Sequence, residues 1–106
     1  KTVVTKVAGT SNEEEEIQID DFSLAQNYPN PFNPNTQINF SLPQSGQVQL
    51  RVYNMLGQQV SVLVDERRNA GAHSIRLNAS ALASGVYVYE LRFNGSVLTN
   101  KMILLK

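Results

Sequence analysis

Apolar and polar residues alternate with a period of two along most of the chain after residue 35. The segment TQINFSL (36–42), for example, would place Ile38, Phe40 and Leu42 on one face and polar side chains on the other. Such alternation is typical of β-strands with one buried face. The pattern predicts seven strands, approximately at 21–26, 36–42, 47–54, 58–65, 71–77, 85–93 and 96–106.

Turn-forming residues separate the expected strands. The pair Asn94-Gly95 predicts a type I′ hairpin turn, because both central residues of that turn need a positive φ. The segment NASALAS (78–84) is the only one compatible with a helix, and we expect it to make one turn that crosses between sheets. The seven segments predict an all-β, immunoglobulin-like antiparallel β-sandwich. Apolar packing alone must hold it together, because the chain has no cysteine.

The alternation also assigns individual residues to the faces of the sheets. In the strand expected at 58–65, Val60, Val62 and Val64 would share one face. In the strand expected at 71–77, His73 falls on the apolar face with Ile75. His73 is the only histidine of the chain, and packing in or beside the core is favoured over a catalytic role for it.

The start of the chain differs from the rest in charge. Residues 1–21 hold two lysines against six carboxylates, whereas residues 22–106 hold seven lysines and arginines against three carboxylates. The run Glu13–Glu16 repels itself and predicts a solvated linker, although KTVVTKVA (1–8) is compatible with a short strand. We expect residues 1–20 to be an acidic linker or the tail of a preceding domain, and residues 21–106 to be the folded domain.

The sequence offers little for catalysis or for a cofactor. It has no cysteine, one histidine and few, scattered carboxylates after residue 21, so nucleophile–base arrangements and metal-ligand spacings are missing. No glycine-rich phosphate loop occurs, and no apolar run approaches the ~20 residues that a membrane-spanning helix needs. We therefore expect no catalytic residue, no metal site, no cofactor and no nucleic-acid partner, and no enzymatic activity.

The segment NYPNPFNPNT (27–36) cannot be a helix or a central strand, because its three prolines fix φ and remove backbone donors. It places Tyr28 and Phe32 between the prolines. Either these aromatic side chains close one end of the sandwich, or they are presented to an outside partner, and the first interpretation is favoured. Exposed aromatic side chains could also stack on sugars. A carbohydrate-binding module is therefore one alternative function.

Three further sequence elements occur in order after residue 22. They are Pro29-Asn30-Pro31 within QNYPNPFNP, the Gly-x-x-Val element from Gly57 to Val60, and GVYVY (85–89) followed by an apolar strand with Lys101 and Lys106. In these elements the chain resembles the type A C-terminal sorting domain of the type IX secretion system. That family occurs in large secreted proteins of the Bacteroidetes and related phyla. It is related to the immunoglobulin-like domain of flagellar hook-capping proteins.

The resemblance implies a set of functional residues, which we call the sorting motif: Pro29, Asn30, Pro31, Gly57, Val60, Gly85, Tyr87, Lys101 and Lys106. It also implies that the prolines fix the crossover into the strand at 36–42. Asn30, Asn33 and Asn35 would then bond to their own backbone to close turns.

The resemblance further implies a function and partners. The domain would direct a cargo N-terminal to residue 1 from the periplasm through the outer-membrane translocon to the cell surface or the medium, without inserting into the membrane. A sortase-like cysteine protease at the surface would then remove the domain, and the cargo could be anchored to an anionic lipopolysaccharide. The alternatives are an accessory module that binds carbohydrate or cell-surface partners, and a structural spacer.

Overall fold

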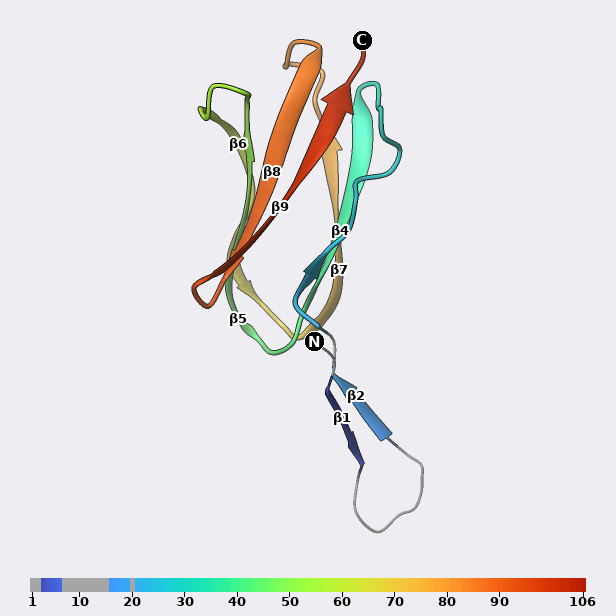
Figure 1. Cartoon of the computed structure of the whole chain (residues 1–106), viewed down its shortest axis with the longest axis vertical. Helices are drawn as coiled ribbons and strands as arrows, with labels where there is room; N and C mark the ends of the chain where they lie inside the picture. The colour runs from blue at the N-terminus through green and yellow to red at the C-terminus, as the bar shows by residue number, and fades with distance from the viewer. Residues whose placement is uncertain (1–2, 7–15, 20) are drawn as a thin grey trace.

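The computed structural model describes the backbone of residues 3–6, 16–19 and 21–106, and the side chains of residues 21–106. The described elements are all β-strands (Figure 1). They are β1 (Val3–Lys6), β2 (Glu16–Ile19), β3 (Ser23–Leu24), β4 (Asn35–Leu42), β5 (Gly46–Tyr53), β6 (Gln59–Arg68), β7 (Gly71–Asn78), β8 (Gly85–Phe93) and β9 (Ser96–Leu104). Among the described segments, none is a helix long and apolar enough to cross a membrane.

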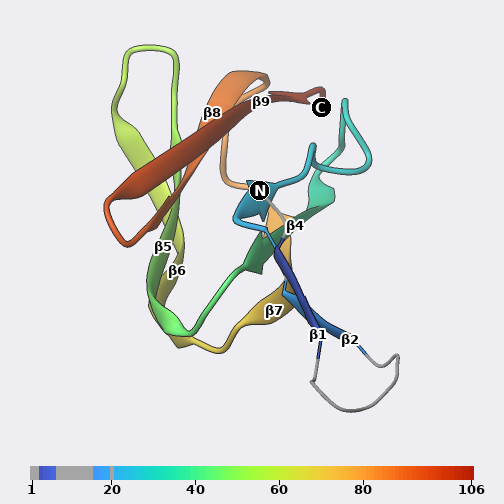
Figure 2. The same ribbon diagram turned by 60° about the horizontal axis from the view of Figure 1, so that its bottom comes forward.

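Seven of the strands form two antiparallel sheets that pack face to face. One sheet has the order β3-β4-β7 and the other has the order β6-β5-β8-β9. Figure 2 shows the two sheets as separate layers, with β4 and β7 in one and β5, β6, β8 and β9 in the other. The chain crosses between the layers from β4 to β5, from β6 to β7 and from β7 to β8, as in immunoglobulin-like folds. The predicted seven-stranded all-β sandwich is confirmed.

Buried and exposed side chains alternate along the strands in the same way as apolar and polar residues alternate in the sequence. In β4, Ile38, Phe40 and Leu42 are buried, whereas Gln37 and Asn39 are exposed. The core between the sheets consists of Phe32, Ile38, Phe40, Leu42, Val48, Leu50, Val52, Val64, Leu77, Ala79, Tyr87, Tyr89, Leu91, Phe93, Met102 and Leu104. Each large apolar side chain contributes about 1.5–3 kcal/mol by burial, so a core of this size can stabilise the domain without disulfides.

The predicted common face of Val60, Val62 and Val64 is wrong. The pairing of β6 with β5 skips from Val64 to Val62, which leaves Leu63 as an extra residue, and it shifts again at Val60. A β-bulge of this kind inserts one residue and reverses the faces of the residues beyond it. Val62 is accordingly 45% exposed, and Leu63 packs against the core instead.

Two connections follow the expectations from the sequence. Asn94 has a φ of 50° and Gly95 a φ of 80°, as the type I′ turn between β8 and β9 requires. Residues 79–84 cross from β7 to β8, and therefore from one sheet to the other. They make a single turn, which is closed by the Leu82 N–H donating to the Ala79 carbonyl at 3.0 Å.

The strand expected within residues 1–8 is present as β1, but it does not belong to the sandwich. It pairs antiparallel with β2, which the alternation did not predict, and the two strands form a sheet of their own. Most of the run Glu13–Glu16, for which we expect a linker, lies outside the described residues, and Glu16 begins β2. The domain boundary between residues 20 and 21 remains a prediction.

Candidate functional site

Most of the sorting motif lies at one end of the sandwich, at the top of Figure 1. We call this the loop end. It consists of the proline loop (27–34), the β5–β6 turn (54–58), the β7–β8 turn (79–84), and the end of β9 with the residues that follow it (103–106).

The strand register explains why these segments meet. Asn35 pairs with Asn78 between β4 and β7, and Gly85 pairs with Leu104 between β8 and β9. The proline loop therefore leaves its sheet at the same end as the β7–β8 turn and the last residues of β9. The chain enters the sandwich through β3, which pairs with Phe40 and Ser41 farther toward the opposite end.

A buried phenol fixes the start of the proline loop. Tyr89 Oη donates to the Ala25 carbonyl at 2.7 Å and accepts from the Asn27 N–H at 2.8 Å. Burial raises the pKa of the Tyr89 phenol above its ordinary value, and hydrogen bonds with Asn100 and Asn27 offset part of this rise. The phenol is therefore protonated at neutral pH, and it serves as donor and acceptor at once.

Asn27 closes the proline loop from the inside. Its buried side-chain amide donates to the Pro29 carbonyl and to Thr36 Oγ1, both at 3.0 Å. Thr36 Oγ1 donates in turn to the Pro29 carbonyl at 2.8 Å. Asn27 Oδ1 accepts from Gln26 Nε2 at 2.6 Å. Since a buried polar network is stabilising only when its members are satisfied, these bonds hold Pro29 in one position.

The proline loop also joins the two sheets. The Phe32 N–H donates to the Ile103 carbonyl at 2.9 Å and the Leu105 N–H donates to the Phe32 carbonyl at 3.0 Å, so Phe32 pairs with Leu104 as a parallel bridge. Asn30 Oδ1 accepts from the Ile103 N–H at 2.9 Å. The prediction that Asn30 bonds to its own backbone is therefore wrong. Its oxygen instead satisfies a donor on β9, which is an edge strand.

The two aromatic residues of the proline loop have opposite environments. Phe32 is only 2% exposed and lies in the core, as predicted for a residue that closes the sandwich. Tyr28 is 81% exposed, so the same prediction is wrong for Tyr28. Two backbone hydrogen bonds of 3.0 Å nevertheless pair Tyr28 with Gln37 of β4, which fixes its main chain while the ring faces outward.

The β5–β6 turn presents two apolar side chains on a rigid support. Asn54 Oδ1 accepts from the N–H groups of Leu56 and Gln58 at 2.9 and 3.0 Å, and the Gly57 N–H donates to the Asn54 carbonyl at 3.0 Å. Gly57 has a φ of +83°, so the backbone conformation favours glycine there although space is free. Met55 and Leu56 are exposed at the tip.

The β7–β8 turn receives Lys106. The Lys106 ammonium donates to the carbonyls of Ser80 and Leu82 at 2.7 Å each. Tyr87, which is buried, donates through its hydroxyl to the Ala83 carbonyl of the same turn at 2.7 Å. The last residues of the chain are therefore held on one side by the β7–β8 turn and on the other by the proline loop.

Lys101 is the residue of the sorting motif that lies away from the loop end, within strand β9. It pairs with Val88 within the β8–β9 ladder, and its side chain is exposed. Its carbonyl accepts from Gln26 Nε2 at 2.7 Å, which ties β9 to the segment before the proline loop. Val60 is half-buried beside the β5–β6 turn, and Gly85 begins β8.

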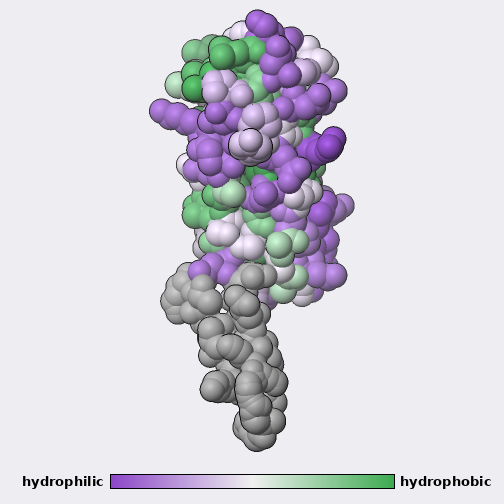
Figure 3. Space-filling view, turned by 90° about the vertical axis from the view of Figure 1, so that its right-hand side faces the viewer, coloured by the Kyte–Doolittle hydropathy of each residue, from purple (hydrophilic) through white to green (hydrophobic). Residues whose placement is uncertain are grey.

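Exposed apolar side chains gather at the loop end. They are Met55, Leu56, Val86, Ile103 and Leu105, and we call them the apolar patch. Val86 and Ile103 are paired across β8 and β9. Figure 3 shows hydrophobic atoms near the top of the molecule, at this end. Because exposed apolar groups of this kind mark interaction surfaces, the patch is a candidate docking surface.

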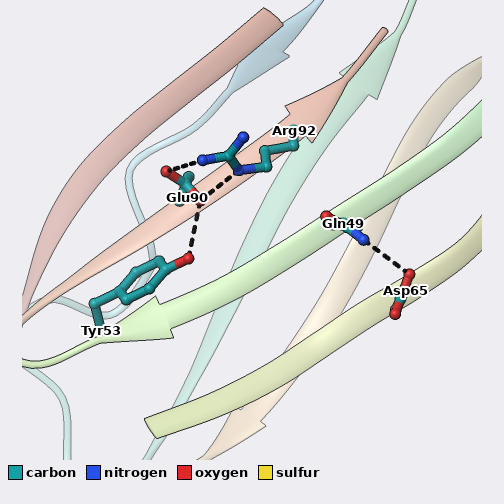
Figure 4. A network of polar contacts seen from close by, with 5 residues as sticks. All are labelled: Gln49, Tyr53, Asp65, Glu90 and Arg92. Carbon is teal, nitrogen blue, oxygen red and sulfur yellow. Dashed lines mark hydrogen bonds and ion pairs between the residues drawn. The ribbon is translucent and has the colours of Figure 1, made fainter. Parts of the chain in front are cut away.

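Glu90 and Asp65, two of the carboxylates of the four-stranded sheet, do not form a catalytic pair. Glu90 of β8 accepts from Tyr53 Oη at 3.1 Å and pairs with Arg92 at 2.9 Å, while Asp65 of β6 accepts from Gln49 (Figure 4). The two acids stand on strands separated by β5, and each has its own partners. The hydrogen bond and charge of Glu90 raise the pKa of Arg92. No three His, Cys, Asp or Glu residues within the described part could together hold a metal ion.

His73 packs as predicted from the sequence. Its ring stacks on Phe40 with 5.2 Å between ring centroids and 26° between planes. Its Nε2 lies 2.8 Å from the Asn69 carbonyl. The only histidine is thus a packing residue of the three-stranded sheet.

Several residues that shape the site carry no motif in the sequence. Alternation places Tyr89 in the core, and a buried phenol always needs polar partners, but the partners cannot be read from its own strand. Asn27 and Asn54 act through contacts within their loops, whereas Asn100 of β9 donates through Nδ2 to the Leu24 carbonyl of β3 at 3.0 Å. Asparagines in loops are a signal for Asn27 and Asn54. Asn100 lies within β9, and its contact has no signal in the sequence.

The model of the family described as the secretion system C-terminal sorting domain matches residues 26–105, from the residue before the proline loop to Leu105. No curated protein and no solved structure matches this chain.

Proposed function

This chain belongs to the family of secretion system C-terminal sorting domains, and from that premise we propose that its loop end docks on the outer-membrane translocon of the type IX secretion system. The domain is a sorting signal for type IX secretion, which carries proteins across the outer membrane to the cell surface or the extracellular space. Its interaction with the type IX machinery follows from this. Members of the family are in general non-catalytic.

The main support for this proposal is that the elements of the sorting motif meet at the loop end. The Pro29–Pro31 element, the β5–β6 turn and the end of β9 are far apart in the sequence, yet they share one end of the sandwich with the apolar patch. A preformed surface loses little conformational entropy when it binds, so the many loop-fixing hydrogen bonds favour recognition. The chain enters through β3 farther toward the other end, which would leave the loop end free of an attached cargo.

Within the sorting motif we assign two kinds of role. Pro29, Pro31, Gly57 and Tyr87 shape the loop end, because each lies in or supports one of its loops. Lys101 and Lys106 supply the positive charges on β9 and after it. In the complex with the translocon, the apolar patch supplies the buried contact area. The two lysines orient the domain on the translocon.

The later steps belong to the same proposal. After export, a sortase-like cysteine protease at the surface removes the domain, and the cargo is joined to an anionic lipopolysaccharide. Residues 1–20 connect the cargo to the sorting domain that begins at residue 21. The separate β1–β2 sheet supports this division, because neither strand pairs with the sandwich.

An export assay tests the proposal. A fluorescent protein is joined to the whole chain and expressed in a host with a type IX system, and its secreted fraction is measured. Removal of residues 22–106 should leave the reporter in the periplasm, as should loss of the translocon. Secretion of the reporter without residues 22–106 would disprove the sorting function of this chain.

A second pair of variants separates charge from folding. Removal of residues 101–106 takes away the buried Met102 and Leu104, so it should both unfold the domain and abolish export. The combined Lys101→Ala and Lys106→Ala variant keeps the apolar residues and should stay folded, although it also loses the Lys106 bonds to the Ser80 and Leu82 carbonyls. Lys101→Ala alone removes a charge and leaves these bonds in place. We expect the combined variant to be retained in the periplasm. Normal export of the folded variant would show that the translocon does not use these charges.

A further inference from the structure

The outer face of the three-stranded sheet carries a row of three side chains, Tyr28, Gln37 and Arg76, that lie outside the sorting motif. Tyr28 of the proline loop pairs with Gln37 of β4, and Gln37 pairs on its other side with Arg76 of β7. Directly paired residues of an antiparallel sheet lie on the same face. All three residues are exposed, so an aromatic ring, an amide and a guanidinium stand side by side.

These three residues also line one surface hollow of about 160 Å³, together with Pro29, Asn35 and Thr36. The hollow has a fixed floor. Thr36 is buried and bonded to the Pro29 carbonyl, and two backbone hydrogen bonds hold Tyr28 to β4. Tyr28 therefore lines a depression in which its main chain is fixed.

Arg76 brings an available positive charge to this hollow. Two other arginines are in ion pairs: exposed Arg92 with Glu90, and half-buried Arg68 with Glu66. Exposed Arg67 donates to Ser45 Oγ at 3.5 Å. Arg76 has no hydrogen bond or ion pair in the part of the chain that the structure describes. Its planar guanidinium is suited to bind a carboxylate through two parallel hydrogen bonds.

The amide beside Arg76 is oriented in advance. Gln37 Nε2 donates to Asn39 Oδ1 at 3.1 Å and to Ser74 Oγ at 3.0 Å. Ser74 donates in turn to Asn39, which completes a ring of polar contacts on the sheet face. The Gln37 oxygen has no partner among the described residues, so it is an acceptor for a ligand hydroxyl. Figure 3 shows that this side of the molecule is mostly hydrophilic below its top.

We propose that this face binds an acidic polysaccharide, with one sugar ring against Tyr28 and the carboxylate of a uronic acid on Arg76. An aromatic ring packs against the C–H face of a sugar, and oriented amides bind its hydroxyls, which is the combination present here. A carboxylate is favoured over a phosphate, because one arginine without a further cation or helix N-terminus is a poor phosphate site.

The volume of the hollow limits the affinity that we expect for an oligosaccharide. Pockets for drug-sized ligands span about 300–1,000 Å³, so a depression of about 160 Å³ holds part of one sugar residue only. The Kd for a short oligosaccharide should therefore be about 1 mM. Longer chains that occupy several domains on a cell surface would bind more tightly through multivalency.

An NMR titration of the whole chain with trigalacturonic acid tests the proposal, with the fully methyl-esterified trimer as the matched neutral probe. We expect saturable amide shifts at Tyr28, Gln37 and Arg76 with the acid and at least tenfold weaker binding of the ester. Tyr28→Ala and Arg76→Gln should each weaken binding about tenfold, as expected for loss of one anchoring contact. Tyr28→Phe keeps the ring and should bind normally.

Arg92→Gln is the matched control, because it removes one exposed arginine charge from the other sheet. It should bind as the unchanged chain does. The proposal is wrong if the acid gives no saturable shifts at about ten times the expected Kd, if the ester binds equally well, or if Arg92→Gln weakens binding as much as Arg76→Gln. Arg76→Gln should be exported normally, so this result is independent of the sorting function.

Discussion

Phe32 and Leu104 pair through their main chains as a parallel bridge, and this bridge joins the proline loop to the end of β9. The pairing stands beside the hydrogen bond from the Ile103 N–H to Asn30 Oδ1, which connects residues separated by 73 positions. Two elements of the sorting motif that are distant in sequence therefore form one structural unit. The proline loop, which leads into the three-stranded sheet, closes the sandwich against an edge strand of the other sheet.

The first prediction contrasts the two aromatic residues of the proline loop. Phe32→Ala should lower the free energy of unfolding by about 3–5 kcal/mol, because it leaves a cavity in the core. Tyr28→Ala should change it by less than about 0.5 kcal/mol, since the ring is exposed. Urea unfolding of the two variants measures both values. Equal losses would contradict the assignment of opposite environments.

The second prediction concerns Asn30. Asn30→Ala leaves the Ile103 N–H without its acceptor, so the end of β9 should open more readily. We expect faster hydrogen exchange at the Ile103 amide and a loss of about 0.5–1.5 kcal/mol in unfolding free energy. Asn33→Ala, in the same loop, is the control and should leave the Ile103 amide unchanged. Unaltered exchange at Ile103 in Asn30→Ala would show that this bond does not hold β9.

The third prediction is an alkaline loss of stability through Tyr89. Below pH ~10 the phenol is protonated in both folded and unfolded chains. Above that pH the unfolded chain releases the proton more readily, because the pKa of Tyr89 is raised in the fold. The free energy of unfolding should therefore fall as pH rises above ~10. Tyr89→Phe should have a shallower fall, although it is less stable at neutral pH.

Tyr28→Phe is the matched control, since it removes the hydroxyl of a tyrosine that is exposed and lies outside the core. Denaturant unfolding between pH 8 and pH 11 compares the three proteins. If the unfolding free energy of Tyr89→Phe falls with pH as steeply as that of the unchanged chain, the pKa of Tyr89 is not raised by folding.

The fourth prediction concerns residues 1–20. Because β1 and β2 pair only with each other, a chain beginning at Asp21 should retain its unfolding free energy within about 1 kcal/mol. Thermal or urea unfolding provides the comparison. A loss several times larger would show that the N-terminal segment packs on the sandwich and that the domain begins earlier.

The sequence predicts the strands well because each one is encoded locally. Strict alternation sets the buried face of β4, β5 and β8 without reference to any other strand. The same reasoning fails in β6, where the bulge at Leu63 depends on pairing with β5. It also misses β2, because the four residues EIQI beside the glutamate run become a strand only through pairing with β1.

The site is less predictable than the fold, since its geometry depends on contacts between distant segments. The sequence predicts a local bond for Asn30, whereas its actual partner is Ile103 on β9. The alternation could bury Tyr89 but could not identify the Ala25 carbonyl and the Asn27 N–H as its partners. The proline loop gives no alternation, so the opposite exposures of Tyr28 and Phe32 follow only from the folded structure.

The central claim is that the translocon binds the loop end, and the secreted fraction of a fluorescent reporter joined to the whole chain tests it most directly. The test variant combines Leu56→Ser and Leu105→Ser, two exposed residues of the apolar patch. Val97→Ser is the matched control, because Val97 is exposed beside the β8–β9 turn at the opposite end.

Both proteins should unfold within about 1 kcal/mol of the unchanged chain, since all three residues are exposed. We predict that the patch variant stays in the periplasm as a folded protein while the Val97→Ser control is secreted like the unchanged chain. Normal secretion of the patch variant, or an equal defect in the control, would contradict docking through the loop end.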